Sequence, residues 1–226
     1  MKKKIFTLLL AFVSIFVLSA CGKNKFNLTD YIVEERNQLF TASDDIYNVT
    51  LSTGLRETNY CLDGVVNELT DFAILSLCRN DNKPLATDSY AYIVKIGEET
   101  ITGFLNKNET DNNYSTDLEL CIPQESVINV KISFTGYSFN KDLENTSNTF
   151  NIDQATALNI ANTELEENIK NIAHSANIEV VSKIVKDFSS SDIKNYYWYV
   201  GVISNKGETL GILIDSNSGE IIAKKV

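Results

Sequence analysis

Short runs of alternating apolar and polar residues fill the first half of the chain. In "IYNVTL" Tyr47, Val49 and Leu51 fall on one face, and "YAYIVKI", "ITGFL", "LELCI" and "INVKISF" continue the period of two. "DFAILSL" is almost entirely apolar, as in a strand buried on both sides. Clusters such as "STG", "LDG" and "NDNKP" separate the runs as turns, and "DYIVEERNQLF" fits a short helix or an edge strand. About seven short strands at this spacing predict an antiparallel β-sandwich of immunoglobulin-like type over residues 28–139.

The pattern changes after residue 139. Residues 140–149, "NKDLENTSNT", are polar without an apolar period, and we interpret them as a linker. An apolar stripe typical of one amphipathic helix follows at steps of three and four, formed by Leu158, Ala161, Leu165, Ile169, Ile172 and Ala176. Strands are then predicted in "EVVSKIVKD", "YYWYVGVIS", "TLGILID" and "EIIAKK". One helix on an antiparallel sheet predicts a small α+β domain over residues 150–226, so the predicted fold class of the whole chain is α+β.

The N-terminus reads as an export signal. "MKKK" is followed by the apolar run "IFTLLLAFVSIFV" and by "LSAC", and the run is short for a transmembrane helix. "LSAC" resembles the bacterial lipobox, in which the signal is cut just before a cysteine that receives lipid. This predicts a signal peptide over residues 1–20, an acylated Cys21, and a short tether over residues 21–27. Two acyl chains hold a protein stably on a membrane, so we expect the protein on the outer face of the cytoplasmic membrane.

The chain is acidic, with a formal net charge of −10. Loss of the signal peptide with its three lysines leaves seventeen basic and thirty acidic residues, a net charge of −13. Phosphate binding needs clustered cations, so nucleic acid is excluded as a partner. Only two prolines, and an apolar content of 43%, indicate a folded chain.

Three motifs in residues 150–226 carry a resemblance to a known family: "IDQATALNIA", "YYWYVGV" and "GILIDSNSGEII". Together they resemble the PepSY domain, found in propeptides of secreted metallopeptidases and in envelope proteins. Trp198 and Val200 match its strand pair, while the motif from Asp215 to Glu220 matches its acidic hairpin turn. The resemblance implies a non-catalytic domain that restrains a peptidase or binds another envelope protein. Because no peptidase sequence follows here, we expect any restraint to act on a separate protein.

Asp215 and Glu220 stand close together around "SNSG", which raises the question of a catalytic carboxylate pair. A hairpin tip in open water lacks the water-excluding pocket that such a pair needs. An aspartate leading into a glycine that can adopt the left-handed conformation fits a tight turn instead. We therefore assign Asp215, Gly219 and Glu220 to a structural turn and predict no catalytic residue.

Alternation along "NYYWYVG" predicts a candidate interaction surface. The resemblance places Trp198 and Val200 under the helix, so Tyr197, Tyr199 and Ile203 lie on the opposite face of the strand. Aromatic side chains on a flat sheet face are typical of interfaces, which makes these residues the predicted partner-binding site. Packing of this face against the first domain remains the alternative.

Other reactive side chains give no clear site. Cys61, Cys78 and Cys121 fit no zinc spacing and allow one disulfide of undetermined pairing. His174, the sole histidine, is predicted at a helix C-terminus, where its charge favours the helix dipole. The loop "NKNETDNNYSTD" offers oxygen ligands but lacks the EF-hand glycine and glutamate. We therefore predict a solvated hairpin loop, with no metal and no cofactor, and a weak calcium site is the alternative.

These patterns together predict a lipid-anchored binding protein of the bacterial cell surface and no enzyme. Its expected partners are the membrane, through the acyl chains on Cys21, and a protein, either a secreted peptidase or another envelope protein. The alternative is an adhesin or scaffold lipoprotein in which the β-sandwich binds and the C-terminal domain is a spacer.

Overall fold

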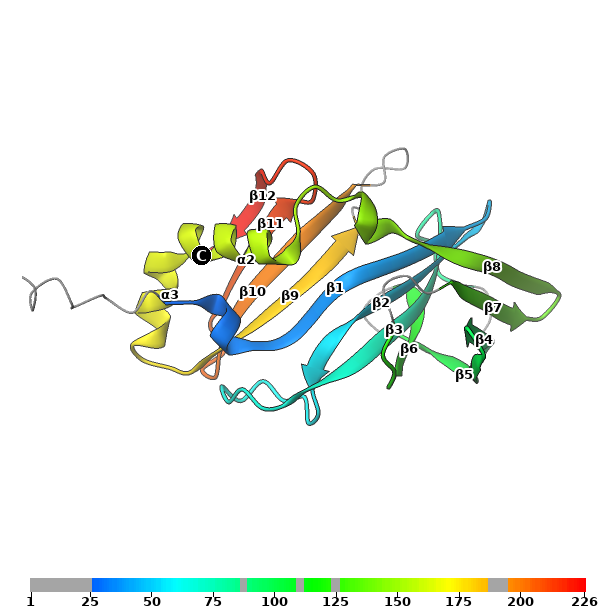
Figure 1. Cartoon of the computed structure of the whole chain (residues 1–226), viewed down its shortest axis with the longest axis horizontal. Coiled ribbons are helices and arrows are strands. Elements are labelled where there is room, and N and C mark those ends of the chain that lie inside the picture. The colour runs from blue at the N-terminus through cyan, green and yellow to red at the C-terminus, as the bar shows by residue number, and fades with distance from the viewer. Residues whose placement is uncertain (1–25, 86–88, 109–111, 123–126, 187–194) are drawn as a thin grey trace, which may run out of the picture.

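The structure is a computed structural model that describes residues 26–85, 89–108, 112–122, 127–186 and 195–226. Eight strands of the described part close into an antiparallel barrel, which lies on the right in Figure 1. In chain order they are β1 (Ile32–Ser43), β2 (Tyr47–Glu57), β3 (Leu69–Arg79), β4 (Tyr90–Ile96), β5 (Glu99–Lys107), β6 (Asn113–Leu118), β7 (Ile128–Phe134) and β8 (Tyr137–Asn145). Around the barrel the order is β1-β2-β3-β6-β5-β4-β7-β8, and β8 pairs with β1 to close it.

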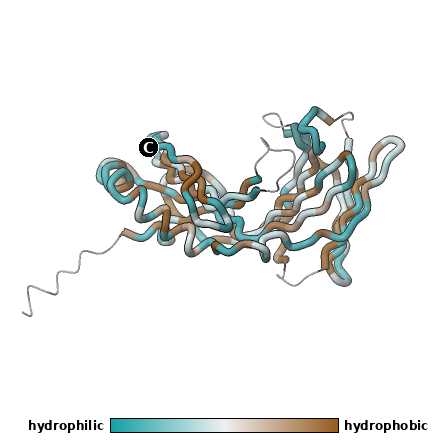
Figure 2. The backbone as a smooth tube through the Cα atoms, turned by 90° about the horizontal axis from the view of Figure 1, so that it is seen from above, coloured by the Kyte–Doolittle hydropathy of each residue, from teal (hydrophilic) through white to brown (hydrophobic). Residues whose placement is uncertain are grey.

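The barrel interior follows from alternation along its strands. Figure 2 shows hydrophobic and polar positions alternating along these strands. Val49 and Leu51 of β2, and Leu75 and Leu77 of β3, are fully buried in one apolar core with residues from the other barrel strands. The residues between them in sequence point to the outer wall, because successive side chains of a strand face opposite sides.

Four further strands extend the sheet beyond β1: β9 (Ile178–Lys186), β10 (Tyr196–Ser204), β11 (Thr209–Asp215) and β12 (Ile221–Lys225). Helices α2 (Gln154–Glu164) and α3 (Glu166–Ala173) cover one face of this extension, at the left in Figure 1. Short 3₁₀ helices, η1 (Leu28–Tyr31) and η2 (Thr146–Thr149), precede β1 and follow β8. A second core forms between helices and sheet around Trp198, Val200 and Ile169.

Strand β1 belongs to both parts of the molecule. One of its edges pairs with β2 along most of its length. The other edge pairs with β9, in parallel, from Ile32 to Arg36, and then with β8 at Phe40 and Thr41. Between these two stretches lies an irregularity in the register with β2, between Arg36 and Gln38. A bulge adds a bend and local twist, which is what lets one strand leave the extension and enter the barrel wall.

The predicted fold class, α+β with an N-terminal β-sandwich, is wrong, because the protein is mostly β and the first eight strands form a closed barrel. Sandwich and barrel strands show the same alternation, and only the pairing of the first strand with the last distinguishes them. The pairs that close the barrel, Phe40 with Asn145 and Thr41 with Glu144, join residues far apart in sequence. Local pattern carries no information on such a pairing.

The segment predicted as a linker, residues 140–149, instead forms most of β8 and then η2. Phe139 and Leu143 are buried in the barrel. Lys141 lies between them in β8, on the same face of the strand. Its amine reaches the carbonyl oxygen of Ser43 at 2.7 Å. This lysine interrupts the alternation of apolar residues, so the sequence pattern does not indicate a strand here.

The predicted single helix is divided at Leu165, whose backbone (φ −105°, ψ 1°) separates α2 from α3. The apolar stripe nevertheless faces the sheet, with Leu158, Leu165 and Ile169 buried. Asp153 caps α2 by accepting a hydrogen bond from the Thr156 amide at 2.8 Å. None of the helices in the described ranges has the length and apolar character needed to cross a membrane.

Candidate ligand-binding cleft

The carboxylate near the C-terminus, Asp215, shapes the connection between β11 and β12. Its Oδ1 accepts hydrogen bonds from the amides of Asn217 and Ser218 at 2.9 and 2.8 Å. The Ser218 amide is the main cause that lowers the pKa of Asp215. Gly219 adopts φ +75°, a conformation that favours glycine, and Glu220 is exposed. The arrangement is that of a turn.

The predicted partner-binding residues, Tyr197, Tyr199 and Ile203, are half-buried on the face of β10 opposite to the helices. The ring of Tyr199 lies across Gly201 and the neighbouring Gly211, because side-chain carbons built there would come within 2.7 and 3.3 Å of it. Lys183 places its amine 5.5 Å from the centre of this ring. Covering a glycine pair is itself a structural role for Tyr199.

Other predicted residues lie apart from one another. Cys21 lies outside the described residues. His174 is the C-cap of α3 and exposed, and Cys61, Cys78 and Cys121 are free thiols. Within the described ranges, no three His, Cys, Asp or Glu side chains gather in a way that would hold a metal ion.

The best-formed recess is a cleft of about 390 Å³ between the outer barrel wall and the start of the sheet extension. Its floor consists of outward-facing positions on β2, β3 and β6 that stand in cross-strand rows. Asn48, Cys78 and Asn113 form one such row. The next row contains Thr50 and Ser76. Ile184 and Lys186 of β9, with Tyr196 of β10, form the opposite side.

Three polar atoms of the cleft residues are buried without a hydrogen-bond partner: Asn48 Oδ1, Ser52 Oγ and Asn113 Oδ1. Asn48 and Ser52 are only 5% and 9% exposed. A buried polar group without a partner costs about 1–3 kcal/mol, so such groups are rare in folded proteins. Of the nine such atoms in the described residues, three belong to residues that line this one cleft, which favours a polar ligand there.

The charges around the cleft differ in sign from the protein as a whole. Arg36 and Lys186 line it, and no carboxylate is found among its described lining residues. Arg36 forms an ion pair with Glu34 at 2.6 Å, so part of the positive charge at the cleft is compensated. Burial raises the pKa of the Cys78 thiol, and the charge of Lys186 acts in the opposite direction. The thiol is therefore held neutral, as a donor within the floor.

This cleft was not predicted from the sequence, because Asn48, Thr50 and Ser52 look like the solvent side of an alternating strand. One signal was present in that pattern. The outward rows of β2 and β3 at this level carry amides, hydroxyls and a thiol but no charge, although 22% of all residues are charged. An uncharged polar row on a protein surface indicates that something covers it.

Comparison with known proteins returns nothing for this chain: no family model, no curated protein and no solved structure matches it. The PepSY resemblance and the lipobox therefore stay predictions from their motifs.

Proposed function

We propose that this protein is a binding protein of the bacterial surface, anchored through Cys21, that holds a small polar ligand with an acidic group in the cleft. The observation that carries the proposal is the set of unpartnered buried atoms at Asn48, Ser52 and Asn113 around one recess. Its volume of about 390 Å³ is within the range of small-molecule sites.

The lining defines the chemistry of the ligand. Amide and hydroxyl groups on the floor match a ligand rich in hydroxyl or amide groups. Arg36 and Lys186 are the charged residues of the described lining, and both are basic, which favours a ligand with a negative group. Leu39, Ile74 and Ile184 would contact a carbon skeleton. A sugar acid or a hydroxylated organic acid combines these features. Burial holds the Cys78 thiol neutral, which favours reversible binding over a covalent step.

Matched sugars test this assignment in the soluble protein from residue 24 onward. Glucuronate, glucose and glucosamine share one ring and differ in charge, and citrate represents a non-sugar acid. We expect the acids to raise the melting temperature and the amine to have the weakest effect. Asn113→Leu should remove the shift, whereas Asn129→Leu on β7, outside the cleft, should keep it. Equal shifts in both variants, or strongest binding of glucosamine, would contradict the proposal.

A protein partner is a second candidate, favoured by the position of Tyr197, Tyr199 and Ile203 opposite to both helices. In this case the sheet extension would occlude a secreted peptidase or bind another envelope protein, as the PepSY resemblance implies. The test is capture of partners from culture fluid by the soluble protein. Tyr197→Ser with Ile203→Ser should abolish capture of a peptidase and Asn113→Leu should not. Tyr199 is left intact because it covers two glycines.

A further inference from the structure

The loop between β2 and β3, residues 58–68, exposes an unusual set of apolar side chains. We call it the apolar loop. Its large apolar residues are between 40% and 51% exposed: Tyr60, Leu62, Val65 and Val66. No other loop in the described ranges exposes four large apolar side chains. Clusters of this kind mark surfaces that contact a partner or a membrane.

The apolar loop is held in place by two buried carboxylates. Glu179 accepts a hydrogen bond from the Gly64 amide, and Glu57 accepts one from the Asn67 amide. Both glutamates are almost completely buried, at 1% and 2% exposure. Gly64 has φ +84° and lies against the side chain of Asn177, which leaves no room for a side chain of its own. Burial of two carboxylates costs free energy, and both are used to hold this loop. The sequence therefore specifies one conformation for the apolar loop.

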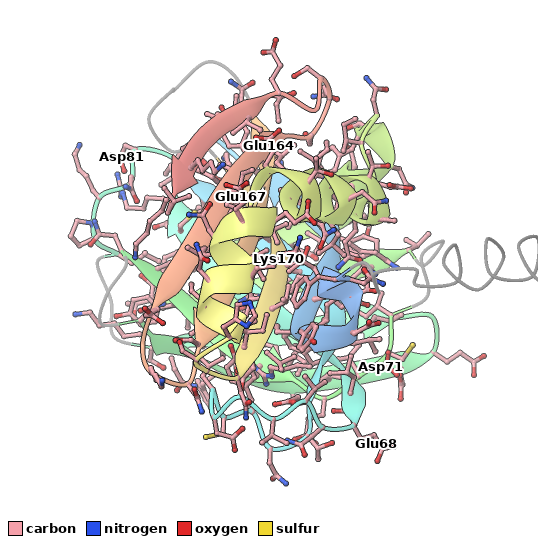
Figure 3. All side chains as sticks on the ribbon, turned by 90° about the vertical axis from the view of Figure 1, so that its left-hand side faces the viewer. Glu68, Asp71, Asp81, Glu164, Glu167 and Lys170 are labelled. Carbon is pink, nitrogen blue, oxygen red and sulfur yellow. The ribbon has the colours of Figure 1, made fainter. Side chains whose placement is uncertain are left out.

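The apolar loop lies at the end of the molecule where the chain leads to its anchor. It forms a groove of about 410 Å³ with η1 and the end of α3, lined by Tyr31, Val65 and Ala176 among others. Figure 3 views this end, with α3 facing the viewer and Glu68 of the loop projecting at the lower edge. Cys21 precedes Phe26 by five residues. An extended chain spans about 3.5 Å per residue, so the anchor lies within about 18 Å of Phe26.

We propose that the apolar loop rests on the bilayer to which Cys21 anchors the protein, with Tyr60, Leu62, Val65 and Val66 in the interfacial region. The proposal rests on the lipid anchoring in the proposed function but not on the cleft. A second contact beside the lipid anchor fixes the orientation of the whole molecule above the membrane. The cleft and the sheet extension are then held at a defined angle.

The contact is apolar and not electrostatic. Asp63 and Glu68 belong to the loop, and Asp71 follows in β3. These negative charges are repelled by an anionic surface, so anionic lipid weakens the contact between the loop and the membrane. Added salt does not release the loop, because the contact is not electrostatic. This weakening by anionic lipid distinguishes the apolar loop from a polybasic membrane-binding segment, which anionic lipid attracts.

The chain supplies its own probe position, because Cys61 is exposed within the apolar loop. The lipidated protein, with Cys78 and Cys121 replaced by serine, is labelled at Cys61 with the environment-sensitive dye NBD. It is then reconstituted into phosphatidylcholine vesicles. The matched control places the dye at Thr135→Cys with Cys61 also replaced. Thr135 is exposed in the β7–β8 turn, at the opposite end of the molecule in Figure 1.

Flotation of the vesicles reports the anchor, and NBD emission reports the loop. We expect both labelled proteins to float and only the Cys61 dye to gain emission several-fold with a blue shift. Leu62→Ser with Val65→Ser should remove the gain while thermal unfolding and flotation persist, and anionic lipid should reduce it. Protein that floats with unchanged Cys61 emission overturns the proposal and leaves the anchor intact. A gain that requires high protein density identifies a second copy as the occupant and also overturns it.

Discussion

Replacement of Asn48 by leucine tests the cleft through two opposite effects. If the side chain of Asn48 is kept for a ligand, the unliganded protein carries a cost that leucine removes. Asn48→Leu should therefore stabilise the free protein and abolish ligand binding together. A purely structural asparagine would instead lose stability on replacement.

The magnitude follows from the environment of Asn48. Its side chain is 5% exposed and its Oδ1 has no partner. An unpaired buried acceptor costs about 1–3 kcal/mol, and replacement by an apolar side chain removes this cost. Leucine has a similar branched shape, and its extra volume can extend into the cleft. The net expectation is a gain of about 1 kcal/mol in the free energy of unfolding, or roughly 2–4 °C in melting temperature for a chain of this length.

Urea unfolding followed by far-UV circular dichroism measures the change, with an unchanged m value as the sign that only stability has moved. Asn129→Leu is the control, because Asn129 also lies in a barrel strand but donates to Asp142 at 2.9 Å. Loss of this hydrogen bond in Asn129→Leu should lower the free energy of unfolding slightly. If Asn48→Leu also lowers the free energy of unfolding by 1 kcal/mol or more, the reasoning about the cleft is refuted.

Three further substitutions test the rest of the fold. Trp198→Phe removes the hydrogen bond to the Ile152 carbonyl (2.8 Å) and should cost about 2–4 kcal/mol, measured by circular dichroism because Trp198 is the only tryptophan. Burial raises the pKa of Glu179, so its contribution to stability is present below pH 4.5 and lost as the pH rises through the raised pKa. Glu179→Gln should therefore be more stable than wild type at pH 8 and lose this pH dependence in urea titrations. The lowered pKa of Asp215 gives the opposite sign: Asp215→Ala should cost about 1 kcal/mol at pH 7 and converge with wild type in thermal melts as the pH falls below 3.8.

Much of the local structure follows from periodicity alone. The prediction that Tyr47, Val49 and Leu51 share a face is confirmed, since all three fill the barrel core. Trp198 is buried beneath the helices, on the side of β10 predicted for it. These features depend on residues close in sequence, which is where alternation and helical spacing carry their information.

Barrel closure and the cleft depend on long-range pairing instead. The contact of Phe40 with Asn145 has no local signature. Ser147 adds to this closure, because its hydroxyl oxygen accepts a hydrogen bond from the Leu39 amide at 3.3 Å. Likewise Asn48 and Lys186 line the same cleft only because β9 pairs with β1. A pattern that describes each strand correctly therefore leaves the partner of each strand open.

The two-sided role of β1 connects the fold to the proposed site. The edge of β1 that faces away from β2 pairs with β9 up to Arg36 and with β8 from Phe40 onward. The sheet extension and the barrel wall therefore diverge between these two residues. Arg36 and Leu39 themselves line the cleft. The recess therefore results from the bend in β1, and its width depends on how tightly the register is held there. Gly54, opposite Arg36 on β2, allows that bend, because a side-chain carbon at this position would come within 1.8 Å of the Glu35 carbonyl oxygen. Gly54→Ala should consequently disturb the cleft and the barrel closure together.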